Sequence, residues 1–135
     1  MPLNITKDSI DIGIVTADAG PMLKFYRDTL GLEFEAEMPM PTGTMHRLRA
    51  GTTVVKIVVH NKPPAAAPAP GGLDGATGYR YWTISVDNIV EASDECAAAG
   101  YKVAVPVTEI RPGVRISMIE DPDGNWVELL QIEAA

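Results

Sequence analysis

Residues 10–32 read IDIGIVTADAGPMLKFYRDTLGL and predict a strand followed by a helix. The isoleucines alternate with other residues from Ile10 to Ile14, and this period of two predicts a strand whose isoleucines face the core. A helix is expected to start at Gly20-Pro21, because proline is well suited to the first helical position. An apolar stripe at helical spacing follows, and Gly31 stands where a left-handed cap is expected.

The same order of elements returns in the second half of the chain. Residues 81–86 alternate as a strand, and Asn88 with Glu91 three residues later has the form of a capping box at the start of a helix that Gly100 ends. Three strand-like stretches follow each helix, expected over 32–38, 44–50 and 53–60, and then over 101–107, 114–119 and 125–132. Both halves therefore predict strand–helix–strand–strand–strand, which is an internal repeat.

A segment rich in proline, alanine and glycine separates the two halves. Residues 61–72 read NKPPAAAPAPGG, and the segment through Gly78 predicts a linker or surface loop without a regular element. Each half has roughly 60 residues, which is small for an independent core. We therefore expect one domain over 1–135, in which module 1 (about 8–60) and module 2 (about 79–132) share a core on either side of a loop at about 61–78.

Composition excludes several function classes. The 135 residues are 46% hydrophobic and 21% charged, a balance typical of globular proteins rather than disordered chains. The net charge of −7 and the absence of a basic cluster argue against nucleic acid and anionic membrane surfaces as partners. A single cysteine, Cys96, excludes an internal disulfide. The sequence contains no apolar run of membrane-spanning length and no visible signal peptide, so we expect a cytoplasmic protein.

Two stretches of the chain resemble the vicinal oxygen chelate superfamily, also called the glyoxalase/bleomycin-resistance/dioxygenase family. They are residues 12–32 and the motif EDPDGNWVEL at 120–129. The resemblance implies an α+β fold in which two βαβββ modules form an open, cupped, barrel-like sheet with the helices outside. It also implies a homodimer, with the modules paired either within one chain or across two chains.

In metal-dependent members of this family, four inward-facing positions on the first and fourth strands of each module hold a divalent ion. By motif they correspond to Asp11, Lys56, Tyr81 and Glu128. Only Glu128 matches the usual set of histidine, glutamate or glutamine. Protonated lysine has no acceptor to offer a metal, and tyrosine is a poor ligand unless its hydroxyl ionises. Asp11 and Glu128 would be the ligands of any surviving metal site, but we expect no metal and no other cofactor.

The same residues can instead form an organic site. In one interpretation, Lys56 forms a structural ion pair with the two carboxylates in place of the metal. In the other, Lys56 anchors a substrate oxyanion, Glu128 or Asp11 acts as general base, and Tyr81 donates a proton.

Four further residues are candidates for substrate binding: Tyr79, Arg115, Trp126 and His60. Strand alternation places the two aromatic residues on the same strand faces as the ligand positions of module 2. The arginine alternates with apolar residues in its strand and is expected to face the same cavity, and the histidine follows Lys56 by four residues on one strand face. Such a lining suits a small aromatic or mixed-polarity ligand, whereas rim packing, surface ion pairs and polar surface are the structural alternatives.

Three functions are compatible with these candidate residues and with the family resemblance. The first is a metal-independent acid/base enzyme, an isomerase, epimerase or lyase, acting on a small carbonyl or aromatic compound. The alternative is a binding protein that sequesters a small molecule, as bleomycin-resistance members do. A further alternative is a divalent-metal glyoxalase or extradiol-dioxygenase-like enzyme with an irregular ligand set, although Lys56 and Tyr81 count against it.

Overall fold

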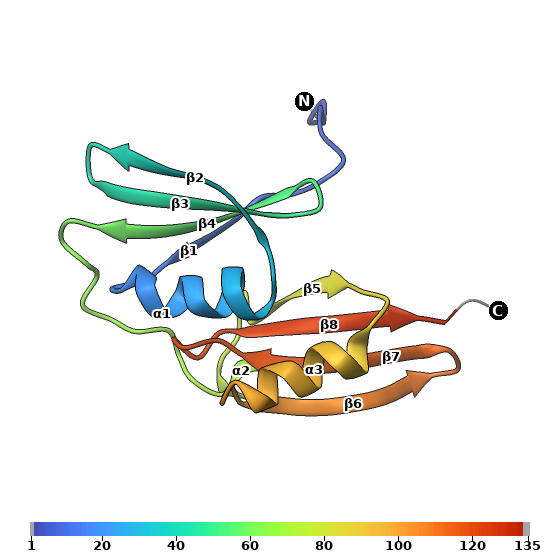
Figure 1. Cartoon of the computed structure of the whole chain (residues 1–135). Helices are drawn as coiled ribbons and strands as arrows, with labels where there is room; N and C mark the ends of the chain where they lie inside the picture. The colour runs from blue at the N-terminus through green and yellow to red at the C-terminus, as the bar shows by residue number, and fades with distance from the viewer. Residues whose placement is uncertain (1, 134–135) are drawn as a thin grey trace. The chain divides into compact units, whose positions relative to one another are not determined.

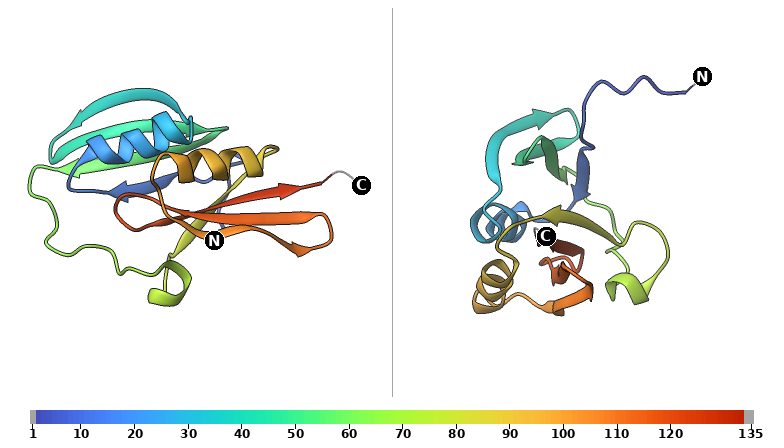
Figure 2. Two further views of the ribbon diagram at one scale, coloured as in Figure 1. Left: turned by 60° about the horizontal axis from the view of Figure 1, so that its bottom comes forward. Right: turned by 90° about the vertical axis from the view of Figure 1, so that its right-hand side faces the viewer.

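The computed structural model describes residues 2–133, which form two compact units that divide between Ala65 and Ala66. Each unit consists of one four-stranded sheet with a helix on one face (Figures 1 and 2). Both units follow the order strand–helix–strand–strand–strand. The predicted repeat and the α+β class are therefore confirmed, and each sheet is open rather than closed into a barrel.

Sheet 1, in the first unit, has the strand order β1-β4-β3-β2, with β1 parallel to β4 and the other pairs antiparallel. Its strands are β1 (Ile12–Val15), β2 (Glu33–Met40), β3 (Gly43–Ala50) and β4 (Thr53–His60). The prediction that Ile10 faces the core is wrong, since it precedes β1 and is 82% exposed. The strand does not reach Ile10 because the Asp11 carboxylate accepts the Val54 N–H at 2.9 Å. A side-chain hydrogen bond thus takes the place of the next backbone hydrogen bond between β1 and β4.

The helical segment of the first unit begins slightly earlier than the sequence predicts. Helix α1 (Ala19–Leu23) is capped by Asp18, whose carboxylate accepts the Gly20 N–H at 3.0 Å, and it continues as the π-helical segment η1 (Lys24–Thr29). Gly31 follows with a φ of +77°, as predicted for the left-handed cap. The core of this unit consists of fully buried side chains from the helical segment and sheet 1: Met22, Phe25, Tyr26, Leu48, Val55 and Ile57.

Sheet 2, in the second unit, repeats this topology with the order β5-β8-β7-β6. Its strands are β5 (Tyr81–Ser85), β6 (Val103–Arg111), β7 (Val114–Glu120) and β8 (Trp126–Ile132), and helix α3 (Ile89–Ala98) packs on one face. A buried hydrogen bond of 2.7 Å between the hydroxyls of Ser93 and Ser117 joins α3 to β7. In the turn between β7 and β8, the buried Asp121 carboxylate accepts the backbone N–H groups of Asp123 and Asn125.

The start of α3 differs from the predicted capping box. Asn88 occupies the N-cap position but its side chain forms no capping hydrogen bond. Instead, Gln131 Oε1 in β8 accepts the Ile89 N–H at 2.9 Å. The cap comes from a neighbouring strand, which local spacing does not reveal.

The connecting segment also differs from the prediction, because it contains a short helical turn. Helix α2 (Gly72–Gly75) follows Gly71, whose φ is +91°. Its glycines allow the left-handed backbone and the close contacts that this turn requires. In the part of the chain described, no helix is long and apolar enough to cross a membrane.

Candidate functional site

The strand register confirms the predicted correspondence between the two modules. Lys56 pairs with Gly13 in the parallel pair of β1 and β4, and Glu128 pairs with Thr83 in the parallel pair of β5 and β8. Each partner lies two residues after the other candidate of its own module, although Asp11 directly precedes β1 rather than lying in it, whereas Tyr81 is the first residue of β5. The four positions suggested by the family motif are thus equivalent in pairs.

One face of sheet 2 lies opposite α3, and we call it the site face. The register with Glu128 places these residues on it: Tyr81, Thr83, Ser85, Ile116, Met118, Glu120, Trp126, Glu128, Leu130 and Ile132. On this face the Thr83 hydroxyl donates to Glu128 Oε1 at 2.8 Å. The half-buried Glu128 carboxylate is therefore oriented by a neighbouring strand.

Trp126 lies beside Tyr81 on the site face and is buried. Its Nε1–H donates to Glu120 Oε1 at 3.2 Å. The backbone of Gly72 rests against its ring, since a Cβ atom at Gly72 would lie only 2.0 Å from a ring carbon. The indole is thus held by a hydrogen bond and by a glycine contact that only a residue without a side chain permits.

Lys56 has open space beside it in sheet 1. One neighbour across the strands is Gly13, where an added Cβ atom would meet no other atom within 4 Å. The other is Arg47, whose Nε atom lies 3.7 Å from Glu35 Oε1. Within residues 2–133, the half-buried Lys56 side chain forms no ion pair within 4 Å and donates no hydrogen bond. In one of the two interpretations of the sequence, Lys56 forms a structural ion pair with Asp11 and Glu128; the pair with Asp11 is not formed in this unit.

Asp11 is engaged elsewhere. Its Oδ1 atom lies 2.6 Å from Lys7 Nζ and accepts the Val54 N–H. The hydrogen bond from Lys7, and then the one from Val54, hold the pKa of the Asp11 carboxyl below its ordinary value. The more distant charge of Lys56 acts in the same direction.

The donor set of the first module does not suit a divalent metal. Of its two family positions, one is a carboxylate already bonded to a lysine and a backbone N–H, and the other is a lysine. Hard divalent cations require oxygen or nitrogen ligands without a competing positive charge. Among the residues that the structure describes, no group of three or more histidine, cysteine, aspartate or glutamate side chains is placed to hold an ion.

The predicted orientation of Arg115 is wrong. It pairs across the strands with Gln131, the residue that caps α3, and its guanidinium forms an ion pair with Glu133. The next residue, Ile116, pairs instead with Leu130 on the site face. The alternation of apolar and polar residues gave the wrong face for Arg115 because the apolar residues of β7 on the site face are themselves buried.

Two other candidates lie at strand ends. Tyr79 precedes β5 and its side chain is fully exposed, so strand alternation does not extend to it. His60 is the last residue of β4 and is half-buried on the same strand face as Lys56, as expected from the spacing. Ligand binding by these residues remains a prediction.

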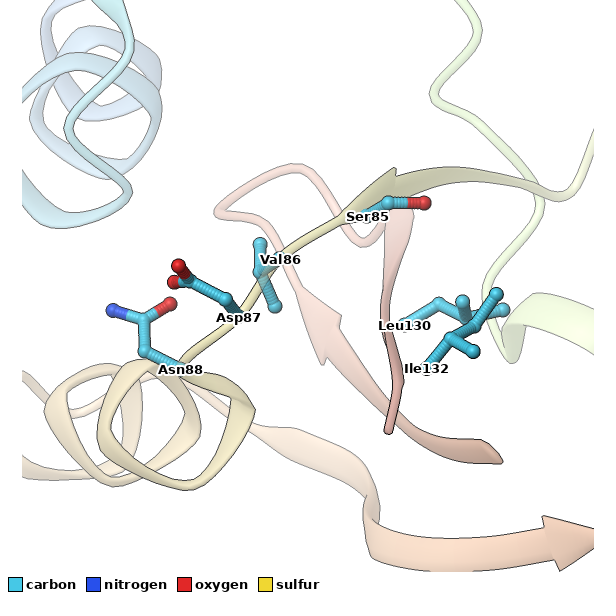
Figure 3. Close-up of a pocket in the computed structure, with 6 residues that line it drawn as sticks. All are labelled: Ser85, Val86, Asp87, Asn88, Leu130 and Ile132. Carbon is cyan, nitrogen blue, oxygen red and sulfur yellow. The ribbon is translucent and has the colours of Figure 1, made fainter. Parts of the chain in front are cut away.

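A pocket that the sequence did not indicate lies where β5 and β8 end. It has a volume of about 510 Å³, and Figure 3 shows the residues that line it: Ser85, Val86, Asp87, Asn88, Leu130 and Ile132. Ser85 and Leu130 form the next residue pair on the site face after Thr83 and Glu128 in the same two strands, β5 and β8. The site face therefore leads from Trp126, past Glu128, into this pocket.

Comparison with known proteins identifies the family. Residues 10–129 match the model of the Glyoxalase/Bleomycin resistance protein/Dioxygenase superfamily. The chain belongs to this superfamily. No curated protein matches this superfamily member in sequence.

Solved structures share the superfamily fold with this chain. A glyoxalase family protein from Bacillus cereus has a TM-score of 0.82 at 16% identity, covering 99% of this chain and 99% of that one. Glyoxalase I from Zea mays has a TM-score of 0.76 at 17% identity, covering 93% of this chain but 44% of that one. TioX from Micromonospora sp. ML1 has a TM-score of 0.68 at 16% identity, covering 95% and 98%. At such identities the likeness concerns the fold and not the activity.

Proposed function

We propose that this superfamily member is a metal-independent acid/base enzyme, an isomerase, epimerase or lyase, that moves a proton on a small carbonyl compound. The observation that supports this most is the Glu128 carboxylate, which is half-buried and oriented by the Thr83 hydroxyl at 2.8 Å. Within residues 2–133, its second oxygen, Oε2, accepts no hydrogen bond from the protein. A positioned carboxylate with one free oxygen is suited to act as a general base.

The proposed step is a proton transfer next to a carbonyl group. Glu128 Oε2 takes a proton from the adjacent carbon, and the C–H electron pair forms the double bond of an enolate whose charge rests on the carbonyl oxygen. The family resemblance assigns the stabilisation of such an oxyanion to the Lys56 ammonium group, and we keep this role for Lys56 as part of the proposal. The Glu128 carboxyl then returns the proton to carbon; alternatively, Tyr81 donates a proton to carbon and regains one from water while Glu128 releases its own, so no further reactant is consumed.

Hydrogen–deuterium exchange tests this function directly. Hydroxyacetone and 2-butanone are incubated with the protein in D₂O, and loss of the proton signal next to the carbonyl is followed by NMR. Glu128→Gln is expected to slow exchange by about 10²–10⁴-fold, the usual contribution of a general base. Lys56→Gln is expected to slow exchange as well, whereas Lys62→Gln, in the exposed connecting segment, is the matched control. Exchange at the wild-type rate in Glu128→Gln would contradict the proposal.

Metal content provides an independent test. Protein purified without an affinity tag is expected to contain only trace iron, manganese, nickel or zinc by plasma mass spectrometry. A stoichiometric metal that is lost in Glu128→Gln would instead support the divalent-metal glyoxalase or dioxygenase alternative.

A binding protein is the second candidate, and the exposed apolar and aromatic side chains near the site face favour it. Tyr81 is 47% exposed and Ile132, at the open pocket, is 68% exposed. Such a surface suits capture of an aromatic or mixed-polarity small molecule. Saturable binding of a ketone without any exchange would support this candidate over the enzyme.

We also propose that the protein is cytoplasmic and that it is a homodimer; the family resemblance implies the homodimer. Sedimentation equilibrium over a range of concentrations tests the dimer, and a monomer at all concentrations would contradict it. A single cooperative thermal transition is expected if the modules at 8–60 and 79–132 form one domain.

A further inference from the structure

The segment that precedes β5 folds back over one end of the site face of sheet 2. Helix α2 lies across this sheet from α3, as the right-hand view of Figure 2 shows. Gly72 is buried against the Trp126 ring, with its φ at +51° and no room for a Cβ atom. A glycine here therefore serves two needs, since an ordinary side chain would be strained and would also collide with the indole.

Arg80 fixes this turn in place. Its Nε–H donates to the Gly72 carbonyl at 2.6 Å, and its Nη2 donates to the carbonyls of Ala69 at 2.8 Å and Pro70 at 3.3 Å. The planar guanidinium can serve three carbonyl groups at once, which a lysine ammonium does with much less directional control. Because Arg80 directly precedes Tyr81 of β5, it ties the turn to the same strand that pairs with Trp126.

The opposite end of the site face is open. Leu130 and Ile132 continue β8 beyond Glu128 and line the pocket of about 510 Å³. In Figure 3 their side chains lie on the same side as Ser85, whereas Asp87 and Asn88 point away from them. This end therefore has open space beside two apolar side chains, whereas the turn at Gly72 lies against the Trp126 ring at the other end.

We propose that the turn at residues 69–75, positioned by Arg80, is the closed end of the ligand site, so that a ligand held at Glu128 extends over Leu130 and Ile132. The substrate class that fits is a carbonyl compound with an unbranched apolar tail of several carbons. This inference rests on the proposed function for the position of the carbonyl group, but the role of Arg80 and Gly72 in covering Trp126 is independent of it. Arg80 is accordingly a positioning residue rather than a catalytic one.

Tryptophan fluorescence tests the closed end. Trp82 and Trp126 are the two tryptophans of the chain, so a Trp82→Phe background leaves Trp126 as the sole reporter. In that background, Arg80→Gln is expected to shift the emission to the red and to raise quenching by acrylamide toward that of the urea-unfolded protein. Arg80→Lys is expected to give partial protection, and Arg111→Gln, at the end of β6, is the matched control and should leave quenching unchanged.

Gly72→Ala gives a second route to the same result, because the added methyl group must displace the turn or the indole. Each variant is first shown by circular dichroism to retain its fold. A folded Arg80→Gln variant with Trp126 as shielded as in the background protein would overturn the proposal for this end.

A homologous series of ketones tests the open end. In the exchange assay, KM for 2-butanone through 2-octanone is expected to fall by about fourfold per added methylene while the tail is buried. Ile132→Ser should abolish this gradient for the longer members, whereas Ile110→Ser, at an exposed position in β6, should preserve it. Exchange that is independent of chain length or of Ile132 would overturn the directional site. Absence of exchange for every ketone would contradict the proposed function instead, and the fluorescence result would still decide the role of Arg80.

Discussion

Gln131 in β8 accepts a hydrogen bond from the backbone N–H of Ile89, the first residue of α3, at 2.9 Å. This contact joins the strand that carries Glu128 to the helix on the other face of the sheet. It satisfies one of the N–H groups that a helix start leaves unpaired. It also leaves the Asn88 side chain free of the capping role, at the edge of the pocket.

Replacing the two residues should therefore have unequal effects on stability. Gln131→Ala is expected to lower the free energy of unfolding by about 1 kcal/mol, as the loss of an N-cap does. Asn88→Ala should cost clearly less, because its side chain forms no capping bond. Gln131→Glu should retain stability, since a carboxylate keeps the acceptor and suits the positive end of a helix. Urea unfolding measures all three, and equal losses for Gln131→Ala and Asn88→Ala would contradict the structure.

The serine pair between α3 and β7 predicts a non-additive double-mutant cycle. Ser117 is fully buried, Ser93 is nearly so, and their hydroxyls are 2.7 Å apart. Either single change to alanine leaves one buried hydroxyl without its partner, at a cost of about 1–3 kcal/mol. The double change removes both polar groups, so its cost should be well below the sum of the two. Additive losses in urea unfolding would show that the two hydroxyls do not depend on each other.

Cys96 is expected to be inert toward thiol reagents in the folded protein. Burial, and then the nearby charge of Glu95, raises the pKa of its thiol to about 11, and its side chain is 1% exposed. The thiolate is the reactive species and is scarce at pH 8. A chromogenic disulfide reagent at pH 8 should react slowly with the native protein and rapidly in urea. Fast reaction of the native protein would mean that α3 opens readily.

Local features of this fold could be predicted from the sequence because short-range chemistry determines them. The alternation in β5 and the positive φ of Gly31 and Gly100 follow from the pattern of residues. The equivalence of Lys56 with Glu128 follows from the repeat, and the strand register confirms it.

Features that depend on a distant segment could not be predicted in this way. The cap of α3 comes from Gln131, 42 residues away, and the turn at Gly72 depends on the carbonyl contacts of Arg80 and on the Trp126 ring. The orientation of Arg115 was predicted wrongly for a related reason. Both faces of β7 are largely buried, so the alternation of apolar residues does not distinguish the site face from the face that packs on α3. A site built from such contacts requires the tertiary structure.

The ion pair between Lys7 and Asp11 gives a prediction about the acid range. Since the folded pKa of Asp11 lies below its ordinary value, its contribution to stability is present above that ordinary value and is lost as the pH falls through the lowered one. Lys7→Met should raise the pKa of Asp11 toward the ordinary value, although the Val54 N–H will keep it somewhat lowered. Lys62→Met, in the exposed connecting segment, is the control and should not change it. Carboxyl titration by carbon-13 NMR measures this pKa, and an identical value in Lys7→Met and wild type would show that Lys7 does not bind Asp11 in solution.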